Sequence, residues 1–80
     1  MIFSLNKVTK TISHHKETCR EVVSFLRKHG LSLTEFKEKR DGVEVGKNQL
    51  WIEETHFSKR LADFFFNGKD YGKLYCSKCF

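Results

Sequence analysis

Proline is absent from the sequence, and no apolar run approaches the ~20 residues that a membrane-spanning helix needs. Without proline the chain has no rigid, proline-rich linker or arm. The first ten residues turn polar too early for a secretory signal peptide, so we expect a cytoplasmic protein with no membrane partner. Cysteine is scarce: the chain has three, and an odd number argues against the fully paired disulfide framework of a small secreted domain.

The length of 80 residues is close to the size at which a single hydrophobic core is just sufficient. We therefore expect one domain over residues 1–80. Bulky side chains are available for its core, because the chain contains eight phenylalanines, two tyrosines and one tryptophan. No internal repeat or low-complexity tract divides the chain.

The net charge of +5 is unevenly distributed along the chain. Residues 1–30 carry six basic and two acidic residues, and residues 55–80 carry five basic and two acidic residues. Residues 31–54 carry four basic and six acidic residues, so the centre of the chain is weakly acidic. A surface formed by the two terminal thirds would attract phosphate groups.

Hydrophobic periodicity predicts strands at both ends of the chain and two helices between them. Residues 2–8 alternate as a half-buried strand, and residues 74–80 do the same. Apolar residues at helical spacing predict a first helix that is capped by Ser13 and ends before Gly30. A second helix is predicted after Thr55, with a core-facing stripe of phenylalanine and leucine side chains: Phe57, Leu61, Phe64 and Phe65.

The segment 31–40 admits two interpretations. As a strand, it would pair with residues 43–52 through the Asp41-Gly42 dipeptide, a common hairpin turn. As a short helix over 33–40, it would use Ser32 and Glu35 as a capping box.

With the strand interpretation, the order is strand, helix, strand, strand, helix, strand. This βαββαβ pattern predicts an α+β, ferredoxin-like domain with two helices on one face of a four-stranded antiparallel sheet. The first and third strands would be central, and the fourth would lie beside the first. With the helix interpretation, the alternative is three helices and a small sheet.

A zinc site is the one cofactor that the sequence suggests. Cys76 and Cys79 form a CxxC pair, and His15 and Cys19 are four residues apart on the predicted first helix, where both can face the same way. Together they would form a tetrahedral Cys3His site for structural zinc. A single CxxC pair is a weak motif, and the alternative is no cofactor, with Cys19 as a small core residue.

Catalytic motifs are absent from the sequence. No histidine is paired at a readable spacing with a nucleophile and an orienting carboxylate, and no glycine-rich phosphate loop is present. The acidic pair Glu53-Glu54 is explained as well by a position at a helix start. We therefore expect a binding protein and not an enzyme.

Nucleic acid, DNA or RNA, is the partner that the charge pattern favours. Pairing of the first and last strands would gather lysines at one edge of the sheet, and Trp51 could stack on bases from the open sheet face. The predicted binding residues are Lys7, Lys10, Lys16, Lys69, Lys73, Lys78 and Trp51. The alternative partner is a protein, bound through the acidic hairpin or an edge strand, as by a small phage-type antagonist of a nucleic-acid-processing enzyme.

Overall fold

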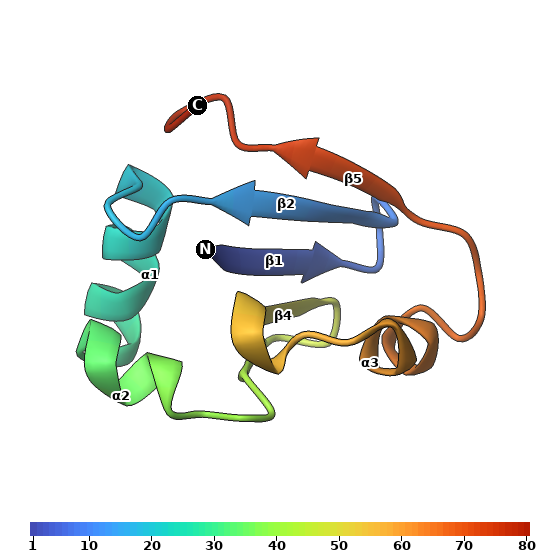
Figure 1. Cartoon of the computed structure of the whole chain (residues 1–80), viewed down its shortest axis with the longest axis horizontal. Coiled ribbons are helices and arrows are strands. Elements are labelled where there is room, and N and C mark those ends of the chain that lie inside the picture. The colour runs from blue at the N-terminus through green and yellow to red at the C-terminus, as the bar shows by residue number, and fades with distance from the viewer.

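A five-stranded mixed sheet with strand order β3-β4-β1-β2-β5 forms the centre of the computed structural model, which describes residues 1–80 (Figure 1). Strands β2 and β5 are parallel, and every other neighbouring pair is antiparallel. The α+β class is confirmed, whereas the four-stranded antiparallel, ferredoxin-like sheet is wrong. In chain order the elements are β1 (Ile2–Asn6), β2 (Thr11–His15), α1 (Arg20–His29), α2 (Leu33–Lys37), β3 (Val43–Val45), β4 (Gln49–Glu53), the 3-10 turn η1 (Glu54–His56), α3 (Lys59–Phe65) and β5 (Gly72–Tyr75).

Residues 2–15 form the β1–β2 hairpin, where the sequence predicted a strand followed by the start of a helix. The side-chain oxygen of Asn6 accepts hydrogen bonds from the N–H groups of Val8 and Thr9, at 2.8 Å and 3.2 Å, and so holds the turn. Ser13 therefore lies inside β2 and does not cap α1, which begins at Arg20.

The last strand, β5, pairs with β2 and not with β1, contrary to the predicted strand order. Its register runs from Thr11–Gly72 to His14–Tyr75, and its four residues are all exposed. The chain leaves the sheet after Tyr75, so only Leu74 and Tyr75 of the predicted strand over 74–80 lie in a strand.

Within the segment 31–40, residues Leu33–Lys37 are helical, so the helix interpretation is correct, although the helix ends before residue 40, and the strand is wrong. Ser32 Oγ accepts a hydrogen bond from the Glu35 N–H, and the Glu35 carboxylate accepts one from the Ser32 N–H, both at 3.1 Å. This reciprocal capping box starts α2. The hairpin shrinks to β3 and β4, and Asp41-Gly42 precedes it and does not form its turn.

Helix α3 starts later than predicted, and the side chains that it directs into the core are not all the predicted ones. Ser58, not Thr55, caps it by accepting a hydrogen bond from the Leu61 N–H at 3.1 Å. Phe66 is buried, whereas Phe64 is 84% exposed, so the prediction that Phe64 belongs to the core stripe is wrong.

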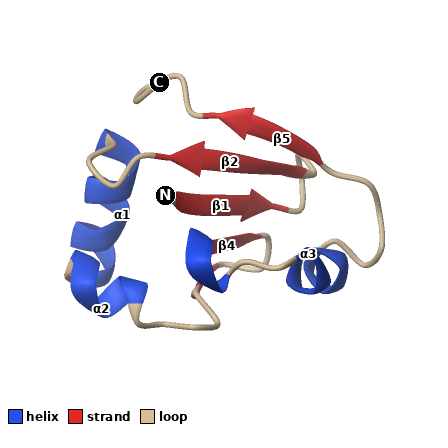
Figure 2. Cartoon of the chain, viewed as in Figure 1, coloured by secondary structure: helices blue, strands red, loops and turns tan.

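The sheet carries a separate hydrophobic cluster on each face, because its strands alternate apolar side chains. One is shared with α1 and α2 and consists of Ile2, Cys19, Val22, Phe25, Leu26, Phe36 and Trp51. The other is shared with α3 and consists of Phe3, Leu5, Ile12, Leu50, Ile52, Ala62 and Phe66. Figure 2 shows α1 and α2 beyond one end of the strands and α3 near the other, so the helices do not share one face as predicted. None of the helices is long and apolar enough to cross a membrane.

Two glycines with positive φ test how tightly β4 is packed. The positive φ of Gly42 (+70°) and of Gly46 (+61°) would strain the backbone of any other residue to a similar degree. The space around them differs: a Cβ at Gly42 would lie 2.4 Å from the Trp51 carbonyl oxygen, whereas one at Gly46 would meet nothing within 4 Å. We expect Gly46→Ala to lower the free energy of unfolding by ~1 kcal/mol, and Gly42→Ala by roughly 1–2 kcal/mol more. Urea unfolding followed by Trp51 fluorescence measures both, and equal losses would contradict the packing described.

Candidate metal centre

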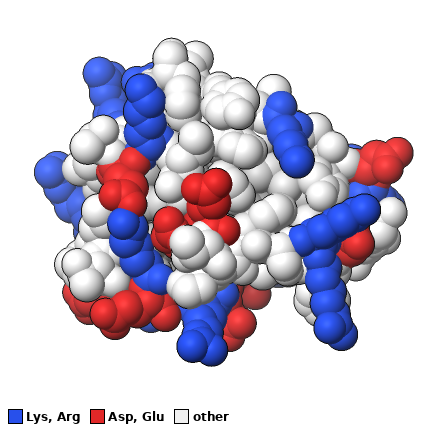
Figure 3. Space-filling view, viewed as in Figure 1, with Lys and Arg blue, Asp and Glu red and all other residues white.

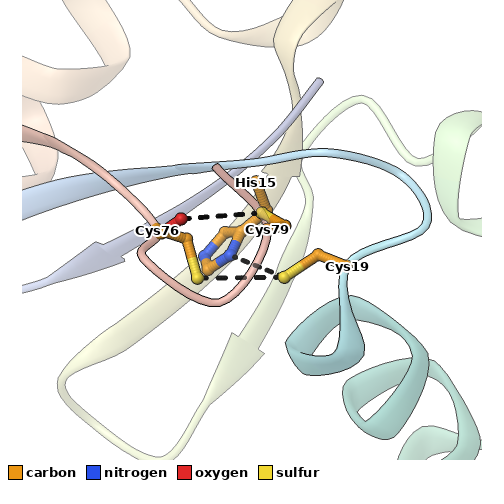
Figure 4. A group of neighbouring side chains, drawn as sticks. All are labelled: His15, Cys19, Cys76 and Cys79. Carbon is orange, nitrogen blue, oxygen red and sulfur yellow. Dashed lines mark hydrogen bonds between the residues drawn. The ribbon is translucent and has the colours of Figure 1, made fainter.

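Four side chains from three separate segments converge at one end of the sheet: His15, Cys19, Cys76 and Cys79 (Figure 4). We call this group the Cys/His cluster. Its four potential ligand atoms all lie within 4.8 Å of one another. His15 and Cys19 are buried, and the other two are partly buried. The structure thus brings together every residue that the sequence suggested for a metal site.

The predicted reason for the convergence is wrong, because His15 and Cys19 do not share a helix. His15 ends β2, and Cys19 is the N-terminal cap residue of α1. A turn joins them, in which the Cys19 N–H donates to the Lys16 carbonyl at 2.9 Å. On the other side, the Cys76 N–H donates to the His14 carbonyl at 2.9 Å, which folds the CxxC turn onto the end of β2.

The imidazole of His15 is held in one orientation. Its Nε2 lies 2.8 Å from Ser4 Oγ, and its ring stacks on Trp51 at a centroid distance of 5.0 Å. Its Nδ1 faces Cys19 Sγ at 3.8 Å. Metal-bound histidines commonly use the second ring nitrogen for such a hydrogen bond, so Nδ1 is the atom placed to bind a metal.

Burial favours the neutral form of this histidine. Burial lowers the pKa of His15 by more than the negative charge of Glu21 raises it, so the neutral imidazole that metals require is favoured.

The three sulfur atoms complete a soft ligand set. Cys19 Sγ lies 3.8 Å from Cys76 Sγ, and all three cysteines are free. The backbone N–H of Lys16 donates to Cys79 Sγ at 3.4 Å, which holds this sulfur against the end of β2. Thiolate and imidazole ligands together select zinc, copper or iron over calcium and magnesium.

An ion pair holds the middle of the CxxC turn. Lys78 Nζ donates to Glu21 Oε1 on α1 at 2.5 Å. This hydrogen bond lowers the pKa of Glu21 and raises that of Lys78. Both side chains are partly exposed, so we assign the pair a role in positioning the turn and little stabilisation.

Trp51 is not available for base stacking, because the premise that it lies on an open sheet face is wrong. Its side chain is 9% exposed. It lies between His15 and Phe25, and its ring stacks on Phe25 at a centroid distance of 4.4 Å. Trp51 therefore supports the His15 ring from within the core.

The six predicted lysines do not form one edge, because β5 pairs with β2 and not with β1. Lys16 and Lys78 flank the Cys/His cluster. Lys73 lies on β5 beside a hollow that His14 and Glu54 also line. The other three gather at the opposite end of the molecule, around a small hollow by the β1–β2 turn: Lys7, Lys10 and Lys69. Figure 3 shows basic side chains toward both ends of one face, with acidic side chains among them and at the centre.

The acidic pair has a structural explanation. The Glu53 carboxylate accepts hydrogen bonds from the N–H and Oγ1 of Thr55, at 2.6 Å and 2.5 Å, and so caps η1. Burial favours the protonated acid, but these bonds and the nearby N-terminal ammonium outweigh it and lower the pKa of Glu53.

Sequence reasoning missed two features that the structure shows: the contact of Ser4 with His15 and the exposure of Phe64. Ser4, which orients His15, had one signal: it alternates with Phe3 and Leu5 and so lies on the opposite face of β1. Phe64 was assigned to the core, and helical spacing alone gave no sign of its exposure.

No protein-family model, curated protein or solved structure matches this chain. The physical properties of the side chains are therefore the basis of the function proposed below.

Cobalt is a spectroscopic probe for the Cys/His cluster. Reduced protein titrated with Co2+ should develop sulfur-to-metal charge-transfer bands and the visible bands of a tetrahedral ion, saturating at equimolar metal. Ser4→Ala should weaken binding by roughly 10–100-fold, as loss of an outer-shell partner does, and His15→Ala by more. The matched control is His14→Ala, which should bind cobalt as the unmodified protein does. Equal effects of His14→Ala and His15→Ala would contradict the assigned ligand.

Proposed function

We propose that this protein is a small zinc-stabilised domain that binds nucleic acid and catalyses no reaction. The geometry of the Cys/His cluster supports the zinc. Zinc with sulfur ligands at ~2.3 Å and nitrogen at ~2.0–2.1 Å places neighbouring tetrahedral donors roughly 3.6–3.8 Å apart. The Cys19–Cys76 and Cys19–His15 donor distances are both 3.8 Å.

The completeness of the ligand set supports a structural role for the metal. Catalytic zinc sites keep one position for water or substrate, whereas structural sites use four protein ligands. Here four side chains supply the donors, and three are thiols. A closed site of this kind stabilises a fold and leaves no place for a substrate.

Strand β5 is the element that this zinc would stabilise. It is an exposed edge strand of four residues, and parallel pairing with β2 is a weak support for so short a segment. The Cys/His cluster fixes the chain directly after it. Metal ligation at Cys76 and Cys79 therefore replaces the disulfide or larger core that small domains otherwise need.

Removal of zinc tests this proposal through β5. Purified protein should contain equimolar zinc, and a chelator should lower its thermal midpoint. The Gly72 amide, which donates to the Lys10 carbonyl just before β2, and the Cys76 amide, which donates to the His14 carbonyl in β2, should then exchange faster with solvent. The Lys7 amide, which donates to Asn48 at 2.8 Å, is the internal control and should stay protected longer. Metal-free protein with unchanged stability and exchange would sink the proposal.

Charge at the opposite end of the molecule supports nucleic acid as the ligand. Lys7, Lys10 and Lys69 line a hollow of about 90 Å³ to which no acidic side chain contributes. None of the three is in an ion pair, in contrast to Lys37 and Lys78, which are paired with glutamates. Unpaired lysines from separate segments favour an extended polyanion over a single carboxylate. The alternative is a protein partner, for which the exposed edge strand β5 is the specific support.

Salt dependence tests the nucleic-acid proposal. Fluorescence anisotropy with a labelled oligonucleotide should give a log–log slope of affinity against salt of about −2, as expected for three phosphate contacts. Replacing Lys7 and Lys69 together by Glu should abolish most of the slope. The charge-matched control replaces Lys28 and Lys39, which lie with α1 and α2 away from the β1–β2 turn, and should bind normally (Figure 1). A salt-independent affinity would overturn the proposal.

A further inference from the structure

Phe64 is the most exposed of the large apolar side chains, at 84%. Its neighbours in α3, Leu61 and Phe65, pack against the core, so the helix has turned Phe64 outward. A single exposed phenylalanine is common and does not by itself indicate a binding site. The residues around Phe64 are the reason to consider it as one.

Two adjoining hollows lie beside Phe64, and they share Lys7, Phe65 and Asn67 as lining residues. The smaller is the lysine-lined hollow described above. The larger, of about 580 Å³, is lined by Phe64 and Lys47. We call the two together the turn-end surface. It is built from the β1–β2 turn, the β3–β4 turn and the end of α3.

The turn-end surface is held in place by contacts between these segments. The Lys7 N–H donates to the Asn48 carbonyl at 2.8 Å, which ties the two turns together. Lys7 Nζ lies 4.8 Å from the centre of the Phe65 ring, which fixes the ammonium between the two hollows. The positive group and the aromatic surface are therefore prearranged relative to each other.

Two carboxylates give the larger hollow a different character from the smaller one. Asp41 and Glu44 line it beside Lys47. They disfavour a phosphate there, but a carboxylate accepts hydrogen bonds from the amino groups of nucleobases. The smaller hollow suits phosphates, and the larger hollow suits a base.

We propose that the turn-end surface binds single-stranded nucleic acid, with phosphates along Lys7, Lys10 and Lys69 and a base stacked on Phe64. The inference rests on the proposed nucleic-acid function and names the form of ligand. A base can stack on a side chain only when it has left its own stack, which is the ordinary state of a single strand. In a duplex the bases are enclosed, and the second backbone would approach the carboxylates of the larger hollow.

Binding of one labelled oligonucleotide, as a single strand and as a duplex of the same sequence, tests the inference. The single strand should bind at least tenfold more tightly. Phe64→Ala should weaken its binding by roughly tenfold, the usual effect of losing one base–aromatic contact, and Phe64→Trp should retain it. The salt slope should be unchanged in Phe64→Ala, because stacking releases no counterions.

The matched control is Tyr75→Ala, which removes another exposed aromatic ring, on β5, and should leave binding unchanged. Trp51 fluorescence of the two alanine variants reports an intact core, and circular dichroism does so for Phe64→Trp, which adds a second tryptophan. Equal affinity for duplex and single strand, with no effect of Phe64→Ala, would overturn the single-strand inference and leave the nucleic-acid function standing. Failure to bind either oligonucleotide would overturn both and favour a protein partner.

Discussion

Three chain segments meet at the Cys/His cluster, and we propose that the rest of the fold depends on that meeting. Cys19 and Cys76 are 57 positions apart, so a metal ion between them closes a loop that contains most of the chain. Closing a long loop removes conformational entropy from the unfolded state, which favours the folded one. The cluster also lies directly after β5, an edge strand whose four residues are all exposed and which pairs with β2 alone.

The β1–β2 hairpin joins the two functional ends of the molecule. Its open end carries His15 and, through Ser4 in β1, the hydrogen bond that orients the imidazole. Its turn carries Lys7 and Lys10 of the turn-end surface. Metal ligation at His15 would therefore rigidify the hairpin that presents the lysines, although the Cys/His cluster and the turn-end surface lie at opposite ends of the sheet (Figure 1).

Sequence reasoning found the four residues of the Cys/His cluster because few residue types bind soft metals, but it gave a wrong reason for their meeting. The β1–β2 turn was missed because it lacks an Asn-Gly or Asp-Gly pair: Lys10 takes the positive φ of 55° that glycine or asparagine usually supplies. The Asp41-Gly42 pair, in contrast, predicted a hairpin turn that does not form. Gly42 is needed there because the chain passes close to the Trp51 carbonyl. The local capping box at Ser32 was readable, because all its atoms lie within one helical turn.

X-ray absorption at the zinc edge of the purified, reduced protein tests the central claim most directly. A closed Cys3His site predicts three sulfur ligands at ~2.3 Å and one nitrogen at ~2.0–2.1 Å. His15→Ala should remove the nitrogen contribution while the sulfur contribution persists, because its Nδ1 is the donor that faces the three sulfur atoms. A first shell made only of oxygen and nitrogen atoms, or protein that is fully folded without any bound metal, would contradict the account.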